Sequence, residues 1–221
     1  MWQGLFEGLQ GRNFMVVAVA MDSRDDAARP WIEAANPGYL ALIDRHHLLA
    51  DLYNMVNVPQ AVWIDEHGRI VRPTEVAGSY EGFRWRDRNT GKLPDEIAAT
   101  TKAAKLRYVE AVRDWVLKGP SSAFAFDEAA ARAHLSLPSA DVALAHAAFR
   151  MGQALLGEGR IEEAQGFLDE ARRRHPESWN IWRQCYKPNE LGLAAGPEFW
   201  ERVQALGDKR YYAHVDMPEM P

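Results

Sequence analysis

Short apolar runs separated by polar turns fill the first third of the chain, a pattern that predicts an α/β layer. Apolar residues at positions 2, 5, 6 and 9 have the spacing of one helix face, and Gly11 can end that helix. The valine-rich run FMVVAVAM at residues 14–21 is typical of a strand buried on both faces of a parallel sheet. Residues 39–43 predict a second strand, after which Asp44 can cap a helix with leucines at positions 48, 49 and 52.

Residues 57–71 (NVPQAVWIDEHGRIV) predict a β-hairpin with a proline at its mouth. Pro59 has no amide hydrogen, so it is excluded from the middle of a central strand but is permitted where a strand begins. Residues 74–94 are polar and rich in glycine, which predicts a long surface loop. Residues 97–117 predict a long amphipathic helix that ends at Lys118-Gly119-Pro120.

The last third of the chain predicts a helical region of a different kind. Residues 119–140 are rich in Ala, Ser and Pro, which indicates a linker with one helical turn near residues 127–134. From residue 145 onward, small residues such as Gly152 and Ala164, followed by Pro176, match the tetratricopeptide template of two antiparallel helices. One such repeat and a fragment are too few for a free solenoid, which takes about three repeats, so the hairpin is expected to lean on the α/β layer. The predicted division is residues 1–118 for the α/β domain, 119–140 for the linker, 141–206 for the helical region and 207–221 for a tail.

Composition narrows the function classes. The net charge of −5 and the absence of a Lys/Arg block argue against a nucleic-acid partner. The longest wholly apolar run is too short to cross a bilayer, and the first residues lack the features of a signal peptide, so no membrane association is expected. A single cysteine excludes an internal disulfide framework and fits a reducing compartment, which makes the cytoplasm the expected location if Met1 is the true start.

Four segments carry a resemblance to a known family. VVAVAMDS, YLALID, LLADLYNMVNVP and AVWIDEHGRIV follow one another in an order that resembles the thioredoxin-fold redoxins, in particular the ResA/TlpA branch and its peroxiredoxin relatives. The resemblance covers residues 14–71, with the helix at 97–117 in the place of the closing helix. It implies a thioredoxin-like sheet, a cis peptide bond before Pro59, and a substrate-binding role for Val58 and Pro59, with Val58 pairing with the backbone of a peptide. The alternative is a trans proline that only begins a strand.

The resemblance also implies parts that the chain lacks. In the family, the first and central strand of the sheet leads to a redox cysteine at a helix N-terminus, where the helix dipole lowers the thiol pKa. Here the sequence begins inside that helix, so the chain is expected to be truncated, with the redox residue upstream of Met1. One explanation is a selenocysteine codon misread as a stop, if Trp2 closes a W-A-x-x-U-G-x-x-W pattern. The other is a start codon misplaced within an ordinary cysteine-containing frame.

No residue of the chain itself is predicted to be catalytic. Cys185 falls where the repeat template has a core leucine, which indicates a buried structural thiol. His46 and His47 are adjacent, so they diverge on a helix and cannot chelate one metal as a pair; with Asp44 they are expected at a solvated helix start. Asp22 and Asp65 stand at strand ends, a placement that suggests paired acid/base chemistry, but the resemblance implies that these positions serve as caps and turn residues. Neither a metal nor a cofactor is predicted.

Further side chains outside these motifs have structural interpretations. His67, in the hairpin turn, is expected to be exposed. The tryptophans at positions 179, 182 and 200 are expected to anchor helix packing, with stacking on a ligand as the alternative.

Two function hypotheses follow. The first is a thiol-disulfide oxidoreductase or peroxidase-like redoxin, inactive as this chain, that acts on protein or peptide thiols and disulfides. The second is a redoxin-like module without redox residues that binds peptides at Val58-Pro59 and protein partners at the helical hairpin.

Overall fold

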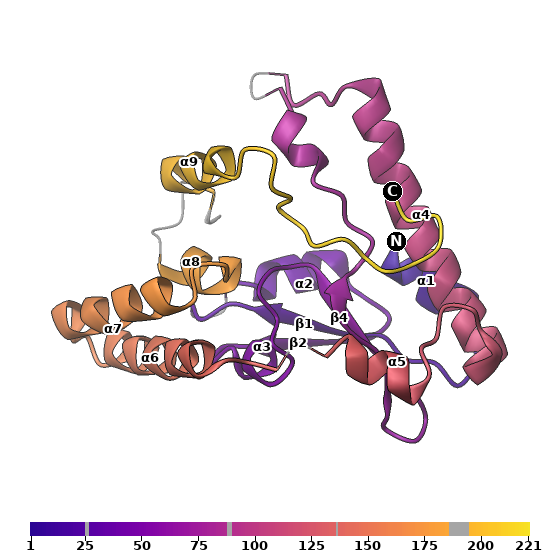
Figure 1. Cartoon of the computed structure of the whole chain (residues 1–221), viewed down its shortest axis with the longest axis horizontal. Helices are drawn as coiled ribbons and strands as arrows, with labels where there is room; N and C mark the ends of the chain where they lie inside the picture. The colour runs from indigo at the N-terminus through magenta and orange to yellow at the C-terminus, as the bar shows by residue number, and fades with distance from the viewer. Residues whose placement is uncertain (25–26, 88–89, 136, 186–194) are drawn as a thin grey trace. The chain divides into compact units, whose positions relative to one another are not determined.

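The computed structural model describes residues 1–24, 27–87, 90–135, 137–185 and 195–221. Within these ranges the chain has α/β architecture, with helices and two sheets of two strands each (Figure 1). None of the helices in these ranges is long and apolar enough to span a membrane.

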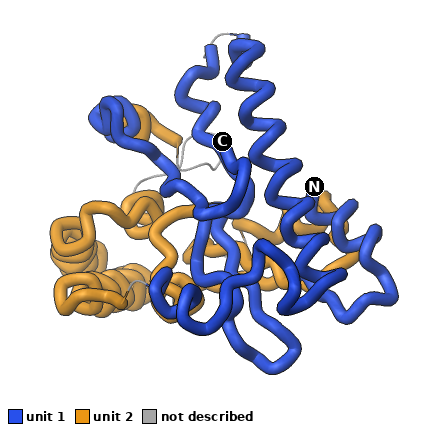
Figure 2. Tube along the Cα trace, turned by 45° about the vertical axis from the view of Figure 1, so that its right-hand side comes forward, with its two compact units in different colours: residues 1–16, 59–135, 202–221 blue, residues 17–58, 136–201 orange. Residues whose placement is uncertain are grey.

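Two compact units are interleaved along the chain (Figure 2). Unit 1 comprises residues 1–16, 59–135 and 202–221, and unit 2 comprises residues 17–58 and 136–201. The predicted boundaries at residues 118, 140 and 206 divide the chain differently and stay a prediction. Both units combine part of the predicted α/β domain with part of the sequence beyond residue 118.

Unit 1 holds the predicted hairpin. Its elements are α1 (Trp2–Gly8), β3 (Gln60–Ile64), β4 (Ile70–Val76), the 3₁₀ helix η1 (Gly82–Trp85), α4 (Asp95–Lys118), the 3₁₀ helix η2 (Gly119–Ser121) and α5 (Glu128–Ala133). Strands β3 and β4 are antiparallel. Between the pairs Ala61–Glu75 and Trp63–Arg72, β4 has one residue more than β3, and Pro73 lies in this bulge. A bulge tolerates a residue that cannot donate to the ladder.

The apolar faces of α1 and α4 build the core of unit 1. Leu5 and Leu9, from the predicted face of the first helix, are buried in a cluster with Tyr108, Ala111 and other residues. The predicted long helix is confirmed as α4, and it ends where Gly119 adopts a positive φ. Asp127 accepts a hydrogen bond from the amide of Ala130 and begins α5, which confirms the predicted helical turn there.

The prediction of a surface loop over residues 74–94 is wrong for its first part. Strand β4 continues to Val76, and the chain that follows packs on α4. A Cβ on Gly78, whose φ is +64°, would lie 2.6 Å from Cβ of Tyr108, and a Cβ on Gly82 would lie 2.6 Å from Oγ1 of Thr101. The glycines that suggested a loop are therefore needed for the close approach of this segment to α4.

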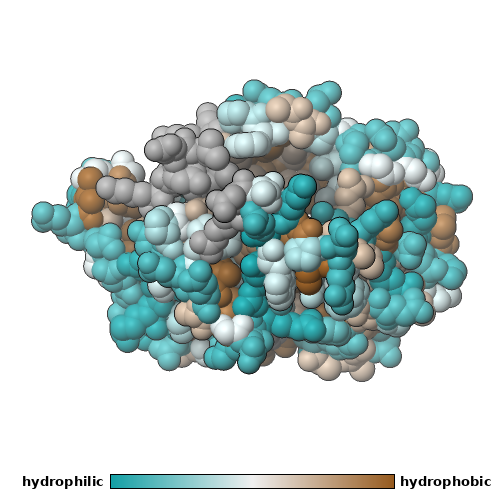
Figure 3. Space-filling view, turned by 90° about the horizontal axis from the view of Figure 1, so that it is seen from above, coloured by the Kyte–Doolittle hydropathy of each residue, from teal (hydrophilic) through white to brown (hydrophobic). Residues whose placement is uncertain are grey.

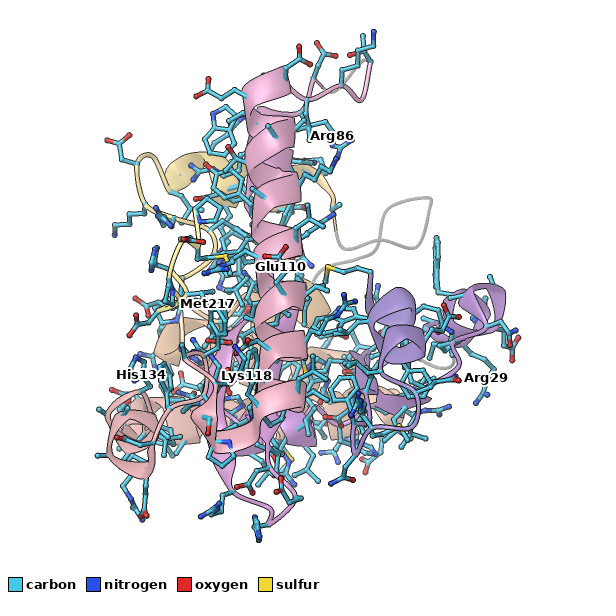
Figure 4. The ribbon with its side chains drawn as sticks, turned by 90° about the vertical axis from the view of Figure 1, so that its right-hand side faces the viewer. Arg29, Arg86, Glu110, Lys118, His134 and Met217 are labelled. Carbon is cyan, nitrogen blue, oxygen red and sulfur yellow. The ribbon has the colours of Figure 1, made fainter. Side chains whose placement is uncertain are left out.

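The C-terminal segment also belongs to the core of unit 1. The guanidinium of Arg84 donates to the carbonyls of Gly207 and Lys209, and the amide of Tyr211 donates to the Glu81 carboxylate. Figure 4 shows the segment around Met217 beside α4, and Met217 is buried in the unit 1 cluster. Residues 207–221 are thus a packed part of the unit.

Unit 2 holds the second sheet. Its elements are β1 (Val17–Met21), α2 (Arg29–Ala35), β2 (Leu40–Asp44), α3 (Leu48–Leu52), α6 (Ala140–Gly157), α7 (Ile161–Arg174) and α8 (Trp179–Cys185), while α9 (Pro197–Ala205) runs from unit 2 into unit 1. Strands β1 and β2 pair in parallel, residue for residue from Val17–Leu40 to Met21–Asp44. The expectation that the first strand is buried on both faces is wrong, because no residue of β1 is buried and Val17 is exposed.

The predicted helical hairpin is confirmed by α6 and α7, which lie side by side and are joined by three residues (Figure 1). A Cβ on Gly152 would lie 2.8 Å from two side-chain carbons of Leu168, and Ala164 is fully buried. Small residues at these two positions therefore allow the helices to meet, as the spacing indicated. Helix α7 ends at Arg174, just before Pro176.

Candidate functional site

The Val58–Pro59 peptide bond joins unit 2 to unit 1. Asn57 is buried, and its Oδ1 accepts a hydrogen bond of 2.9 Å from the amide of Val58. Pro59 is exposed, and its carbonyl accepts from the amide of Ala77 at 3.2 Å. The Val58 amide, which the resemblance assigns to a peptide, is thus engaged by Asn57. The substrate-binding role of Val58 and Pro59 stays a prediction.

Strand β3 begins at the residue after Pro59, and its outer edge is the one that faces away from β4. The Pro59 carbonyl and the Asp65 amide both bond toward the β4 side, the latter to the Arg69 carbonyl at 2.9 Å. Main-chain groups alternate in direction along a strand, so those of Val62 and Ile64 point away from β4. In the described part of the chain, β3 pairs with no strand other than β4. The outward main-chain groups of Val62 and Ile64 therefore have no strand partner within the described residues.

The β1–β2 sheet carries an exposed apolar face. Residues paired in register on parallel strands project on the same side, so Val17, Val19, Leu40 and Leu42 share one face. Val17, Leu40 and Leu42 are 53%, 50% and 44% exposed. Single exposed apolar residues are common, and the view in Figure 3 shows several among hydrophilic ones. This face differs because its aliphatic side chains are neighbours.

Three histidines lie where the first part of unit 2 meets its helical hairpin. We call the group formed by His47, His146, His175 and Asp51 the histidine seam. His47, which precedes α3, packs edge-on against Phe149 of α6, with ring centroids 5.3 Å apart. Nδ1 of His146 lies 3.9 Å from a carboxylate oxygen of Asp51, and the rings of His146 and His175 are 5.9 Å apart. The sequence pattern gave no signal for this group, because its members are far apart along the chain.

The solvated helix start predicted around His47 is wrong for that residue, whereas His46 is exposed as expected. His47 is only 3% exposed, and neither of its ring nitrogens has a hydrogen-bond partner among the described residues. Burial lowers its pKa to about 4, although Asp44 and Asp22 act in the opposite direction. Asp44 does cap α3 as predicted, since its two carboxylate oxygens accept from the amides of Leu48 and Leu49 at 3.1 and 2.7 Å.

The only thiol of the chain is poorly suited to nucleophilic chemistry. Cys185 is partly buried and packs against the core of the helical hairpin. Burial raises its pKa to about 12, so the thiolate is scarce at neutral pH. The arrangement agrees with the structural role predicted for this residue.

The remaining predicted side chains have structural surroundings. Asp65 holds the hairpin turn by accepting from the amides of His67 and Arg69, and the side chain of His67 is exposed. Asp22 was expected to act as a cap, but it bonds to Arg24, and α2 begins without a side-chain cap. Trp179 packs against Phe199, and Trp200 against the same ring. Among the described residues, no three His, Cys, Asp or Glu side chains are placed to hold a metal ion.

A buried charged network in unit 1 was missed at the sequence level. Arg72 is 1% exposed and forms a two-pronged ion pair with Glu75, with distances of 2.7 to 3.0 Å. Its guanidinium also donates to the carbonyls of Phe124 and Asp216, each at 2.7 Å. The Tyr108 hydroxyl donates to Glu75, and burial raises the pKa values of both groups. Because the guanidinium and carboxylate are paired and hydrogen-bonded, the network binds chain segments together rather than forming a reactive centre.

No protein-family model matches the chain, and comparison with curated proteins and with solved structures finds no significant similarity. The resemblance to redoxins rests on the quoted sequence motifs alone.

Proposed function

We propose that this chain is a redoxin-like binding module that takes up an extended peptide by strand addition at the outer edge of β3. The outward main-chain groups of Val62 and Ile64 carry the proposal. An added strand gains main-chain hydrogen bonds from such an edge, and side-chain pockets supply selectivity.

The order of elements supports the redoxin part of the proposal. A parallel pair of strands, β1 and β2, precedes an antiparallel pair, β3 and β4, and the long helix α4 follows them. This is the order that the motifs at residues 14–71 imply for a thioredoxin-like sheet. The chemistry of Cys185 favours binding over catalysis, because the chain has no other thiol.

The experiment is a calorimetric titration of the chain with seven-residue peptides of alternating valine and threonine, which measures their binding affinity. Two N-methylated versions of the peptide serve as matched controls. Methylation of alternate amides on one edge of the peptide should abolish binding, and methylation of the other edge should leave it intact, because only one edge can pair with β3. Equal binding of both versions would contradict strand addition.

A variant of the protein then locates the edge. Val62→Pro removes the outward donor and should weaken binding at least about tenfold, whereas Val62→Thr keeps it and should bind as the parent chain does. Circular dichroism of both variants checks that the fold is kept. Peptide binding that survives in a folded Val62→Pro variant would contradict the assignment to β3.

The second candidate is a redoxin with thiol-disulfide oxidoreductase activity, which the order of motifs favours. It requires a thiol or selenol from polypeptide other than these 221 residues. Insulin reduction with glutathione as electron donor tests this requirement: this chain alone should show no turnover, and turnover that Cys185→Ser abolishes would contradict both the requirement and the structural role of Cys185.

A further inference from the structure

We propose that acidification separates α6 from α3 at the histidine seam, while α8 stays bound to the segment that follows α3. The proposal concerns contacts within unit 2 and is independent of peptide binding at β3.

The seam contains imidazoles that are buried without adequate acceptors. Both ring nitrogens of His47 and the Nε2 of His175 lack hydrogen-bond partners in the described structure. A neutral imidazole tolerates this surrounding better than a charged imidazolium, because burying an unpaired charge is costly. Protonation of His47 would therefore place a positive charge against the ring of Phe149 on α6.

The carboxylates around the histidine seam offset only part of the effect of burial on the three histidines. The carboxylates of Asp44 and Asp22, at the ends of β2 and β1, raise the pKa of His47, whereas His146 of α6 lowers it. Asp51 raises the pKa of His146 and Arg150 lowers it. Glu177 raises the pKa of His175. Both oxygens of Asp44 are already engaged by the amides at the start of α3. Asp22 accepts from the main chain and side chain of Arg24. Burial is the largest influence on all three histidines, and it lowers the pKa of each.

The sign of the pH effect follows from these directions. A histidine whose pKa is lower in the folded state contributes its full stability above the ordinary value of 6.5, and that stability is lost as the pH falls toward the folded value, about 4 for His47. Between pH 7 and pH 5, His47 alone should shift the equilibrium toward the open form by roughly 20-fold. His146 and His175 act in the same direction.

Three hydrogen bonds that hold α8 do not titrate in this range. The side chain of Asn180 in α8 donates to the Met55 carbonyl at 2.7 Å, and its amide donates to the Val56 carbonyl at 3.2 Å. The Ser23 amide donates to Oε1 of Gln184, also in α8. These neutral hydrogen bonds keep their strength as the pH falls, so α8 remains attached when α6 separates from α3.

Hydrogen exchange of the full chain at pH 7 and pH 5, corrected for intrinsic exchange rates, tests the proposal. Amide protection in α3 and α6 should fall at least about tenfold, with protection in α8 and in α4 of unit 1 unchanged. His47→Asn, which tolerates the positive φ of 53° at this position, should remove most of the fall. His46→Asn, at the exposed neighbouring position, should leave it unchanged.

Two outcomes would overturn the proposal. One is an equal loss of protection in α4 and α6, which would indicate general acid unfolding. The other is a His47→Asn variant as acid-sensitive as the parent chain. If that variant does not fold at pH 7, the imidazole of His47 is titrated by NMR in the parent chain, and protonation without any loss of α6 protection refutes the coupling.

Discussion

Replacing Gly152 by alanine should destabilise unit 2, although alanine is the better helix former. The added Cβ would lie 2.8 Å from Cγ and Cδ2 of Leu168 and 3.3 Å from the carbonyl oxygen of Ala164. Overpacking of this kind costs about 1–3 kcal/mol, and replacing a helical glycine returns about 0.5–1 kcal/mol. The net expectation is a loss of about 1–2 kcal/mol in the free energy of unfolding.

Gly166 of α7 is the matched control. A Cβ there would meet no atom within 4 Å, and the position is exposed. Gly166→Ala should therefore stabilise the chain by about 0.5–1 kcal/mol through helix propensity alone. Urea unfolding, monitored by far-ultraviolet circular dichroism, measures the free energy of unfolding of both variants. The two values should change in opposite directions and differ from each other by about 2 kcal/mol.

A double-mutant cycle identifies the contact responsible. Leu168→Ala alone should cost about 2–5 kcal/mol, and in that background Gly152→Ala should become neutral or stabilising, because the two clashing carbons are gone. The reasoning is refuted if Gly152→Ala stabilises the parent chain as much as Gly166→Ala does. An additive cycle would show that the cost arises elsewhere.

Three further predictions concern other parts of the molecule. Arg72→Met should cost about 3–5 kcal/mol in thermal unfolding by leaving Glu75 buried without its cation, and adding Glu75→Gln should recover most of the loss. The Cys185 thiol should react with an aromatic disulfide reagent at least about tenfold more slowly in the native chain than in urea, and equal rates would contradict its burial. Asp44→Ala should cost about 0.5–2 kcal/mol by removing the acceptor at the start of α3, whereas Glu33→Ala, at an exposed site, should change little in the same urea assay.

The spacing of apolar and small residues predicted the helices that bury one face against a neighbouring element. The spacing of Leu5 and Leu9 identified α1, and small residues at 152 and 164 identified the hairpin, because each helix must bury one stripe. The turn at Asp65 followed from the same local chemistry, since its carboxylate bonds to nearby amides.

Tertiary context determined what the sequence could not. An apolar strand such as β1 is buried only if other elements cover it, and the described residues leave Val17 exposed. His47 was expected in solvent because its neighbours are polar, yet a helix roughly 100 residues further along the chain covers it. The burial of Arg72 had one weak indication, which is that Arg72 pairs across the hairpin with Trp63, a residue of the core. Paired residues share a face, so the arginine had to enter the core with a counter-ion.

The two sheets differ in how their edges are protected, and this bears on the proposed function. The outer side of β4 receives a hydrogen bond from the Phe126 amide to the Val71 carbonyl, and β3 is entered by a proline that limits pairing at one end. Strand β1 has neither a proline nor a charged residue along its length. Val17, Leu40 and Leu42 are already about half covered, so covering each of them fully would contribute roughly half of the 1.5–3 kcal/mol of a fully exposed side chain, a few kcal/mol for the face. Apart from this face, β1 also pairs with a strand on one side only in the described residues, so it has a free edge for strand addition as β3 does. The Val62 variants therefore separate addition at the edge of β3 from addition at the edge of β1.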